Sequence, residues 1–319
     1  MRSSVTRTTP SSVFEDVPQN FTLPQESSLE FDGSRVRYWT YTAPRSEVLV
    51  DSPLILMVHG FRGDHHGLAL IAQELSTEWD VVVPDLPGFG TSEPLVDRTH
   101  SSETYADVIA ALIQQLRPRP IVLVGHSFGS VVAARTAAHS PDGVEALALI
   151  NPICEPALES SARIPSLAAS AFYRACAALP AAIGDRLIRS SWVTRISSEL
   201  MMKNRDPRLR RFINGQHDAY FGSFASRDVV LQAYESSIRD TVTDVAAHVQ
   251  VSTALIVAEH DDLGSVPAQE RLAARFPRAD LHVIPEVGHL IHYETPRRAA
   301  VLIATFVEAH IPSTVGGSL

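Results

Sequence analysis

A serine in a glycine-flanked turn is the most reactive arrangement in the sequence. Residues 125–129 read Gly-His-Ser-Phe-Gly, which fits the pattern Gly-x-Ser-x-Gly. An apolar run at 121–124 precedes them, and a helix-forming stretch follows through His139. A serine on such a strand-to-helix turn has a strained backbone and an exposed hydroxyl, beside N–H groups at the start of a helix. We therefore expect Ser127 to be a nucleophile.

The elements that must position this serine are short apolar runs that alternate with helical stretches. Asp32-Gly33 lies between two alternating apolar stretches and predicts a β-hairpin. The other runs are typical of strands buried on both faces, and their alternation with helices predicts a mostly parallel sheet. Such a sheet binds ligands at the C-terminal ends of its strands, where we expect Ser127, Asp261 and His289. The buried runs cover residues 54–58, 81–83, 121–124, 146–150, 254–258 and 281–284.

The order nucleophile, acid, histidine, each after a buried strand, resembles the α/β-hydrolase fold superfamily. The resemblance extends from about Leu29 to His310 and implies an α/β fold with a mostly parallel central sheet, flanking helices and an inserted helical cap. Within this superfamily, the chain resembles capped serine hydrolases of the esterase and lipase type. The motifs that carry it are His-Gly-Phe at 59–61, Asp-Leu-Pro-Gly-Phe-Gly-Thr-Ser at 85–92, the turn at 125–129, Asp261, and Gly288-His289.

The resemblance gives each reactive side chain a role. A serine hydroxyl needs a neighbouring base, so His289 is expected to take the Ser127 proton and return it to the leaving group. Asp261 is expected to hold His289 in the reactive tautomer. Asp262 stays open as an alternative acid, because the acid loop is longer here than in relatives. We prefer Asp261, which is nearer the strand end and better anchored.

Two backbone N–H groups are the expected oxyanion hole. One belongs to Phe128, directly after the nucleophile, and the other to Phe61, in the loop after strand 54–58. The loop reads His-Gly-Phe, not the glycine-rich form found in some lipases and esterases.

The domain organisation follows from a change of pattern near residue 153. Residues 26–152 and 245–311 are expected to form the hydrolase core. Residues 153–244 lack short buried runs and contain Ala-rich helical stretches, so we expect a helical cap or lid there. We expect flexible tails at 1–25 and 312–319. Part of the cap's aromatic set should line an apolar pocket.

Bulk composition restricts the function classes. The chain has 319 residues, 45% hydrophobic and 20% charged, with a net charge of −9. This acidity argues against a nucleic-acid partner, and no run is long and apolar enough for an integral membrane segment. Two isolated cysteines and no apolar leader segment favour a cytoplasmic location. The sequence leaves the oligomeric state open.

No metal or cofactor is expected. Asp64, His65 and His66 invite a metal interpretation, but consecutive side chains should splay apart and no third ligand is evident. We interpret them as a helix start. The Gly-Phe-Gly-Thr-Ser stretch at 88–92 lacks the lysine of a phosphate-binding loop.

The expected function is hydrolysis of small carboxylic esters with an apolar acyl or alkyl group, through a Ser-His-Asp triad and an acyl-enzyme. The resemblance leaves two enzyme alternatives: carbon–carbon bond hydrolysis of ring-cleavage products, and thioester hydrolysis. A ligand-binding receptor on a hydrolase scaffold is the non-enzyme alternative.

Overall fold

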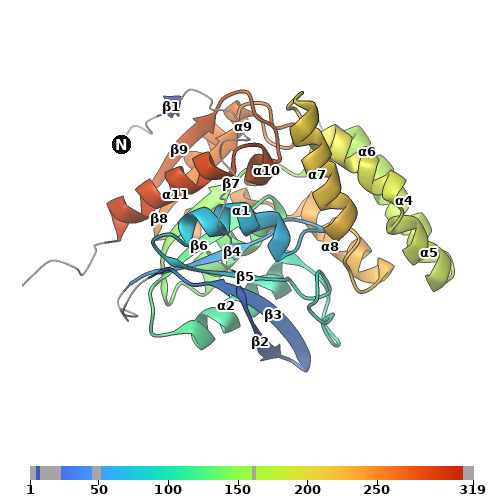
Figure 1. The fold of residues 1–319 in the computed structure, drawn as a ribbon, viewed down its shortest axis with the longest axis horizontal. Helices are drawn as coiled ribbons and strands as arrows, with labels where there is room; N and C mark the ends of the chain where they lie inside the picture. The colour runs from blue at the N-terminus through green and yellow to red at the C-terminus, as the bar shows by residue number, and fades with distance from the viewer. Residues whose placement is uncertain (1–4, 8–22, 45–51, 160–162, 312–319) are drawn as a thin grey trace, which may run out of the picture.

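A computed structural model describes the chain except for residues 1–4, 8–22, 45–51, 160–162 and 312–319. The strands of the described chain form one sheet in the order β1-β9-β8-β7-β6-β4-β5-β3-β2 (Figure 1). The strands are β1 (Val5–Arg7), β2 (Gln25–Phe31), β3 (Ser34–Tyr41), β4 (Leu54–Val58), β5 (Asp80–Pro84), β6 (Ile121–His126), β7 (Val144–Ile150), β8 (Ser252–Ala258) and β9 (Ala279–Ile284).

Strand direction confirms the predicted sheet. Strands β5, β4, β6, β7, β8, β9 and β1 pair in parallel, while β2 and β3 are an antiparallel hairpin that joins β5 at one edge. The hairpin turn is Asp32-Gly33, with φ of 47° and 79°. These left-handed conformations suit a short Asp-Gly turn, as predicted.

The buried strands are apolar on both faces because helices cover both. In β4, Leu54 and Leu56 pack into one apolar layer, and Ile55 and Met57 into the other. Side chains alternate across a strand, so a continuous apolar run fills both layers. Helices α2 (Ser102–Leu116), α3 (Phe128–His139) and α9 (Val266–Ala273) cover the first face, and α1 (His65–Leu75) and α11 (Pro296–His310) the second.

The chain between β7 and β8 forms the helical insertion. Its α-helices lie together at one end of the molecule, beyond the sheet (Figure 1). We call residues 153–244 the cap. Its α-helices are α4 (Arg163–Ala178), α5 (Ala181–Ile188), α6 (Ser191–Met201), α7 (Pro207–Tyr220) and α8 (Arg227–Arg239).

Two local expectations were wrong. Within the expected N-terminal tail, Val5–Arg7 forms β1, which pairs in parallel with β9, and β2 already begins at Gln25. The edge strand of a sheet has unpaired backbone N–H and C=O groups, which can bind any extended segment. The sequence pattern did not reveal that residues 5–7 would pair there. The rest of that tail up to residue 22, and residues 312–319, lie outside the described residues. In the described chain, no helix is long and apolar enough to cross a membrane.

Candidate active site

Ser127 lies at the turn between β6 and α3 in a conformation that side chains rarely adopt. Its φ and ψ are 54° and −122°. Glycines make this turn possible by letting backbones approach closely. A Cβ on Gly129 would lie 2.2 Å from the Val58 carbonyl oxygen, and one on Gly125 would lie 2.6 Å from the Ser130 Cα. The motif glycines are therefore required by close packing around a strained serine.

Gly129→Ala tests this packing. The added methyl would meet backbone oxygens of Val58 and His59, which cannot move without shifting β4, so we expect a loss of about 3 kcal/mol or more in the free energy of unfolding. Gly215→Ala in α7 is the control, because its Cβ would meet nothing within 4 Å. We expect it to be neutral or stabilising by up to about 1 kcal/mol. Urea unfolding of both variants measures the difference, and equal stabilities would contradict the packing argument.

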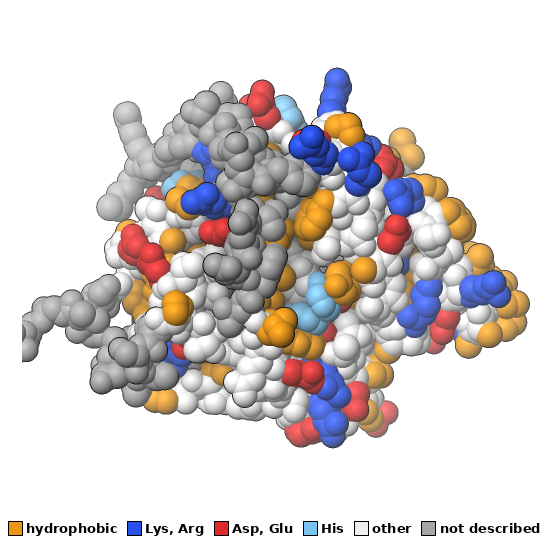
Figure 2. Space-filling view, in the orientation of Figure 1, with side chains coloured by type: hydrophobic (Ala, Val, Ile, Leu, Met, Phe, Trp, Pro, Cys, Tyr) orange, Lys and Arg blue, Asp and Glu red, His pale blue; other side chains and the backbone are white. Residues whose placement is uncertain are grey.

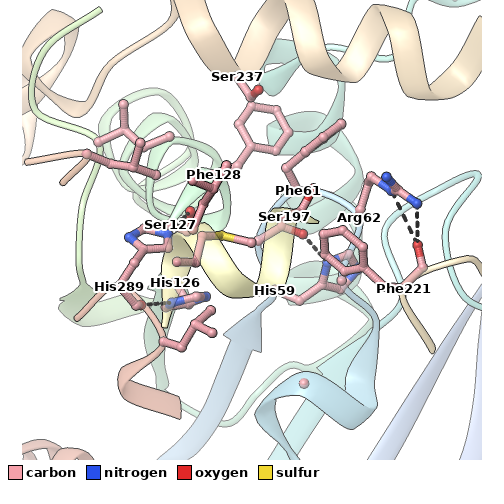
Figure 3. A pocket seen from close by; sticks show the side chains of 18 of the residues that line it. His59, Phe61, Arg62, His126, Ser127, Phe128, Ser197, Phe221, Ser237 and His289 are labelled. Carbon is pink, nitrogen blue, oxygen red and sulfur yellow. Dashed lines mark hydrogen bonds between the residues drawn. The ribbon is translucent and has the colours of Figure 1, made fainter. Parts of the chain in front are cut away.

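The structure brings the three predicted reactive side chains together (Figure 3). The Ser127 Oγ lies 2.8 Å from His289 Nε2. On the other side of the ring, His289 Nδ1 lies 2.9 Å from Asp261 Oδ2 and 3.1 Å from Asp261 Oδ1. All three residues are less than a tenth exposed. They follow β6, β8 and β9, so they meet at the C-terminal edge of the parallel sheet.

Asp261 and Asp262 lie in different surroundings. The Asp261 side chain is 2% exposed, and its Oδ1 also accepts the Leu263 N–H at 2.9 Å. The Asp262 side chain is 65% exposed and forms an ion pair with Lys203 of the cap. Only the Asp261 carboxylate reaches the His289 ring within hydrogen-bond distance, among the residues that the structure describes.

The electrostatics of His289 are set by two opposing effects. Burial by itself would lower the pKa of His289, because a charged imidazole loses its hydration. The charge and hydrogen bond of Asp261, together with the charges of Asp262 and Glu294, outweigh burial, so the pKa of His289 is raised above its ordinary value. The Asp261 carboxylate thus favours the protonated histidine that forms when a serine proton is transferred.

Two side chains to which the sequence assigned no role in the site hold the His289 loop in place. Asn151, at the end of β7, donates from Nδ2 to the His289 carbonyl at 2.9 Å and accepts the Ala258 N–H at Oδ1, at 2.8 Å. Glu294 is fully buried and accepts the Gly288 N–H at 3.1 Å. Burial raises the pKa of Glu294. Asn151 directly follows a buried strand, so the sequence could predict that it lies at the edge of the sheet near the site. The sequence could not predict its hydrogen bond to the His289 carbonyl.

Other histidines surround the site without reaching the nucleophile. His292 packs on His126, with ring centroids 4.2 Å apart, and His126 Nε2 lies 3.3 Å from the His289 carbonyl oxygen. Burial lowers the pKa of His126 to about 3 and holds the pKa of His292 well below its usual range. Both rings are therefore neutral packing groups behind His289.

Two backbone donors lie beside the serine. Gly60 approaches so closely that a Cβ there would lie 3.1 Å from the Ser127 Cβ, which places the following residue, Phe61, next to the nucleophile (Figure 3). Within the described chain, the N–H groups of Phe61 and Phe128 have no hydrogen-bond acceptor. Free N–H groups in this position can stabilise negative charge on a substrate oxygen.

A cavity of about 500 Å³ lies over Ser127, between the core and the cap. Phe61 contributes an aromatic wall with Tyr173 and Tyr234 of the cap, at ring-centroid distances of 6.0 and 5.4 Å. The cap aromatics and methionines separate into two groups. Tyr173, Met201, Tyr220, Phe221 and Tyr234 line the cavity, whereas Phe172, Trp192, Met202, Phe212 and Phe224 do not.

Arg62 connects the core to the cap and was not anticipated. Its side chain is among the largest that are fully buried, and its guanidinium donates to the carbonyl oxygens of Phe221 at 3.0 Å and Ile188 at 3.2 Å. It also donates to the Tyr173 hydroxyl at 3.3 Å. Arg62, directly after Phe61, therefore forms hydrogen bonds to three separate segments of the cap. An arginine in a loop usually indicates solvent exposure, so the sequence carried no signal for this role.

The expectation that Asp64, His65 and His66 splay apart was wrong. Their potential ligand atoms lie within 4.8 Å of one another. Asp64 caps α1 by accepting the His66 N–H, which folds its carboxylate back over the helix start. His65 Nδ1 lies 2.9 Å from Asp85 Oδ1, and His66 Nδ1 lies 3.2 Å from Asp64 Oδ1. These groups are thus already partnered within the fold.

A mostly parallel sheet, a strained serine after β6, and an acid and a histidine after β8 and β9 define a protein of the α/β-hydrolase class. A model of the alpha/beta hydrolase family matches residues 55–301, and the chain belongs to this family.

Similar proteins include hydrolases of several kinds. The chain is 29% identical over 245 residues to a pimeloyl-[acyl-carrier protein] methyl ester esterase of Chromobacterium violaceum, covering 76% of this chain and 89% of that one. It is 25% identical to monoacylglycerol lipase ABHD6 of Bos taurus, covering 82% and 77%. A thermophilic esterase of Thermogutta terrifontis has the same fold, with a TM-score of 0.69, 22% identity, and coverage of 90% and 99%.

Proposed function

We propose that the protein is a serine hydrolase that cleaves carboxylic esters with an apolar acyl or alkyl group. The observation that supports this most directly is the hydrogen-bonded series from Asp261 through His289 to Ser127, at the base of a cavity under the cap. Two relatives named as an ester esterase and a lipase are consistent with it.

In the proposed mechanism, Ser127 Oγ attacks the ester carbonyl while His289 Nε2 accepts its proton. The carbonyl π electrons move to oxygen, where the N–H groups of Phe61 and Phe128 stabilise the negative charge. As the tetrahedral species collapses, the C–O bond breaks and His289 protonates the leaving alcohol. Water then attacks the acyl-Ser127 ester, with His289 again the base, to release the acid.

The cavity favours a small apolar substrate. Its wall includes the apolar and aromatic side chains of Phe61, Ile153, Tyr173, Tyr234 and Leu263. Apolar walls around a polar reaction centre are typical of sites for acyl or aryl groups. We propose that the physiological substrate is such an ester and that the protein acts in the cytoplasm.

A fluorophosphonate probe tests the proposal directly. We expect covalent labelling of the folded protein, with the modified peptide containing Ser127, because the probe traps a serine activated by a histidine. Labelling carried out at a pH low enough to protonate His289 should be slower. Native protein that stays unlabelled while a known serine esterase is labelled in parallel would contradict the proposal.

A substrate panel separates the alternatives. We expect p-nitrophenyl esters of short apolar acids to be turned over faster than acyl-CoA thioesters or vinylogous diketones. Preferred turnover of the diketones would instead favour carbon–carbon bond hydrolysis. Tight binding without turnover, unchanged by Ser127→Ala, would favour a ligand-binding receptor.

A further inference from the structure

The cap presents large apolar side chains to solvent. Among the described residues, eleven large hydrophobic side chains are exposed, and eight of them lie between residues 158 and 200. A concentration of this kind on one face marks an interaction surface more often than a solvated one. The eight are Leu158, Ile164, Leu167, Leu179, Ile183, Trp192, Ile196 and Leu200.

These side chains form stripes along two helices. On α6, Trp192, Ile196 and Leu200 are spaced four residues apart, and each is more than half exposed. On α4, Ile164 and Leu167 begin an exposed stripe that continues through alanines toward Leu179. Residues four apart share one face of a helix, so each stripe is a continuous apolar face directed away from the core.

The two helices also border the cavity over Ser127. Pro165 and Ala169 of α4 and Leu200 and Met201 of α6 line it. Leu200 is both a lining residue and 62% exposed, so the apolar outer surface is continuous with the cavity. Leu200 therefore gives the outer surface an apolar contact with the cavity.

The same face is basic in an acidic protein. Residues 163–201 contain five arginines against Asp185 and Glu199, whereas the whole chain has a net charge of −9. Glu199 pairs with Arg210, Arg174 with Glu235 and Arg195 with Asp218, whereas Arg186 and Arg189 form no ion pair among the described residues. Figure 2 shows blue side chains interspersed with orange ones at the cap end of the molecule.

We propose that the outer face of α4–α6 docks on an anionic lipid surface, with the cavity mouth against the lipid. Exposed apolar residues including a tryptophan, flanked by arginines, are the chemistry of peripheral membrane binding. The acidic remainder of the chain would be repelled, which orients the cap toward the lipid. Two copies joined by this face would bring like charges together, so a symmetric dimer is disfavoured.

Vesicle co-sedimentation tests the docking surface. We expect the protein to bind phosphatidylcholine vesicles that contain phosphatidylglycerol, and to bind pure phosphatidylcholine much more weakly. The combined variant Leu167→Gln, Trp192→Gln and Ile196→Gln should lower the partition coefficient about 100-fold. These three side chains are exposed and do not line the cavity, so turnover of a soluble ester should stay the same.

Matched controls isolate the surface. Val96→Gln with Val301→Gln removes exposed apolar groups outside the cap (51% and 56% exposed) and should leave binding unchanged. Arg163→Glu with Arg186→Glu should lower binding to anionic vesicles by about fivefold or more per substitution. Ser127→Ala should bind as the parent does, so failure of the proposed chemistry would not affect this test.

Three results would overturn the proposal. The first is equal binding of the parent and the glutamine variant to anionic vesicles, and the second is no binding by either. The third is a dimer in sedimentation velocity that the glutamine variant dissociates, because the apolar face would then be a contact between copies.

Discussion

Ser127→Ala is expected to lower kcat on the preferred ester by about 10⁴–10⁶-fold. The alanine has no oxygen to attack the carbonyl, and the neighbouring hydroxyl of Ser130 cannot replace it. That hydroxyl donates to the Ser127 carbonyl at 2.5 Å and accepts the Ile153 N–H at 3.2 Å. Residual activity should come from substrate binding and the two backbone N–H donors alone. Steady-state kinetics, with purified protein checked by mass spectrometry, measure the loss.

The matched control is Ser130→Ala, which removes a serine hydroxyl from the same turn. We expect Ser130→Ala to lower the free energy of unfolding by about 1–3 kcal/mol, because the Ile153 N–H loses a buried acceptor. Its kcat should stay within about tenfold of the parent value if the turn keeps its shape. A Ser127→Ala protein that retains turnover close to that of Ser130→Ala would remove Ser127 from the mechanism.

Asp261→Asn is expected to lower kcat by about 10⁴-fold, with the fold preserved. The amide has nearly the shape of the carboxylate, but it can present an N–H to His289 Nδ1 and so favour the wrong tautomer. It also cannot stabilise the positive imidazolium. The control is Asp262→Asn, whose side chain is exposed and pairs with Lys203, so its kcat should change by less than about threefold. The reverse result would make Asp262 the acid.

The pH profile of activity gives an independent measure of the contact between Asp261 and His289. His289 must be neutral to accept the serine proton, so activity should rise as pH increases through its pKa. Asp261 raises the pKa of His289, against the effect of burial. In Asp261→Asn the burial effect remains while the carboxylate is gone, so the acid limb should move to lower pH as the plateau falls. An unchanged acid limb would mean that Asp261 does not control His289.

Much of the fold was predictable, because in many segments the local sequence pattern agrees with the position that the segment takes in the tertiary structure. The apolar run at 54–58 became β4, whose side chains fill both core layers. Asp32-Gly33 formed the hairpin turn. The edge strand β1 was missed, because Val5–Arg7 has no such pattern and gains its partner only from β9.

Within the candidate site, the sequence by itself determined the types of reactive group and their order. Ser127, Asp261 and His289 each follow a strand of one parallel sheet. The carboxyl ends of parallel strands meet at one edge, so strand order along the chain was enough to bring the three together.

Only the tertiary structure decided the contacts that depend on distant segments. It placed Asp261 against His289 and turned Asp262 toward Lys203, a choice between adjacent residues that depends on side-chain direction. It also buried Arg62 among carbonyl groups of the cap. Such contacts join residues between 28 and 159 positions apart, and no local pattern of hydrophobicity or spacing records which of them will meet.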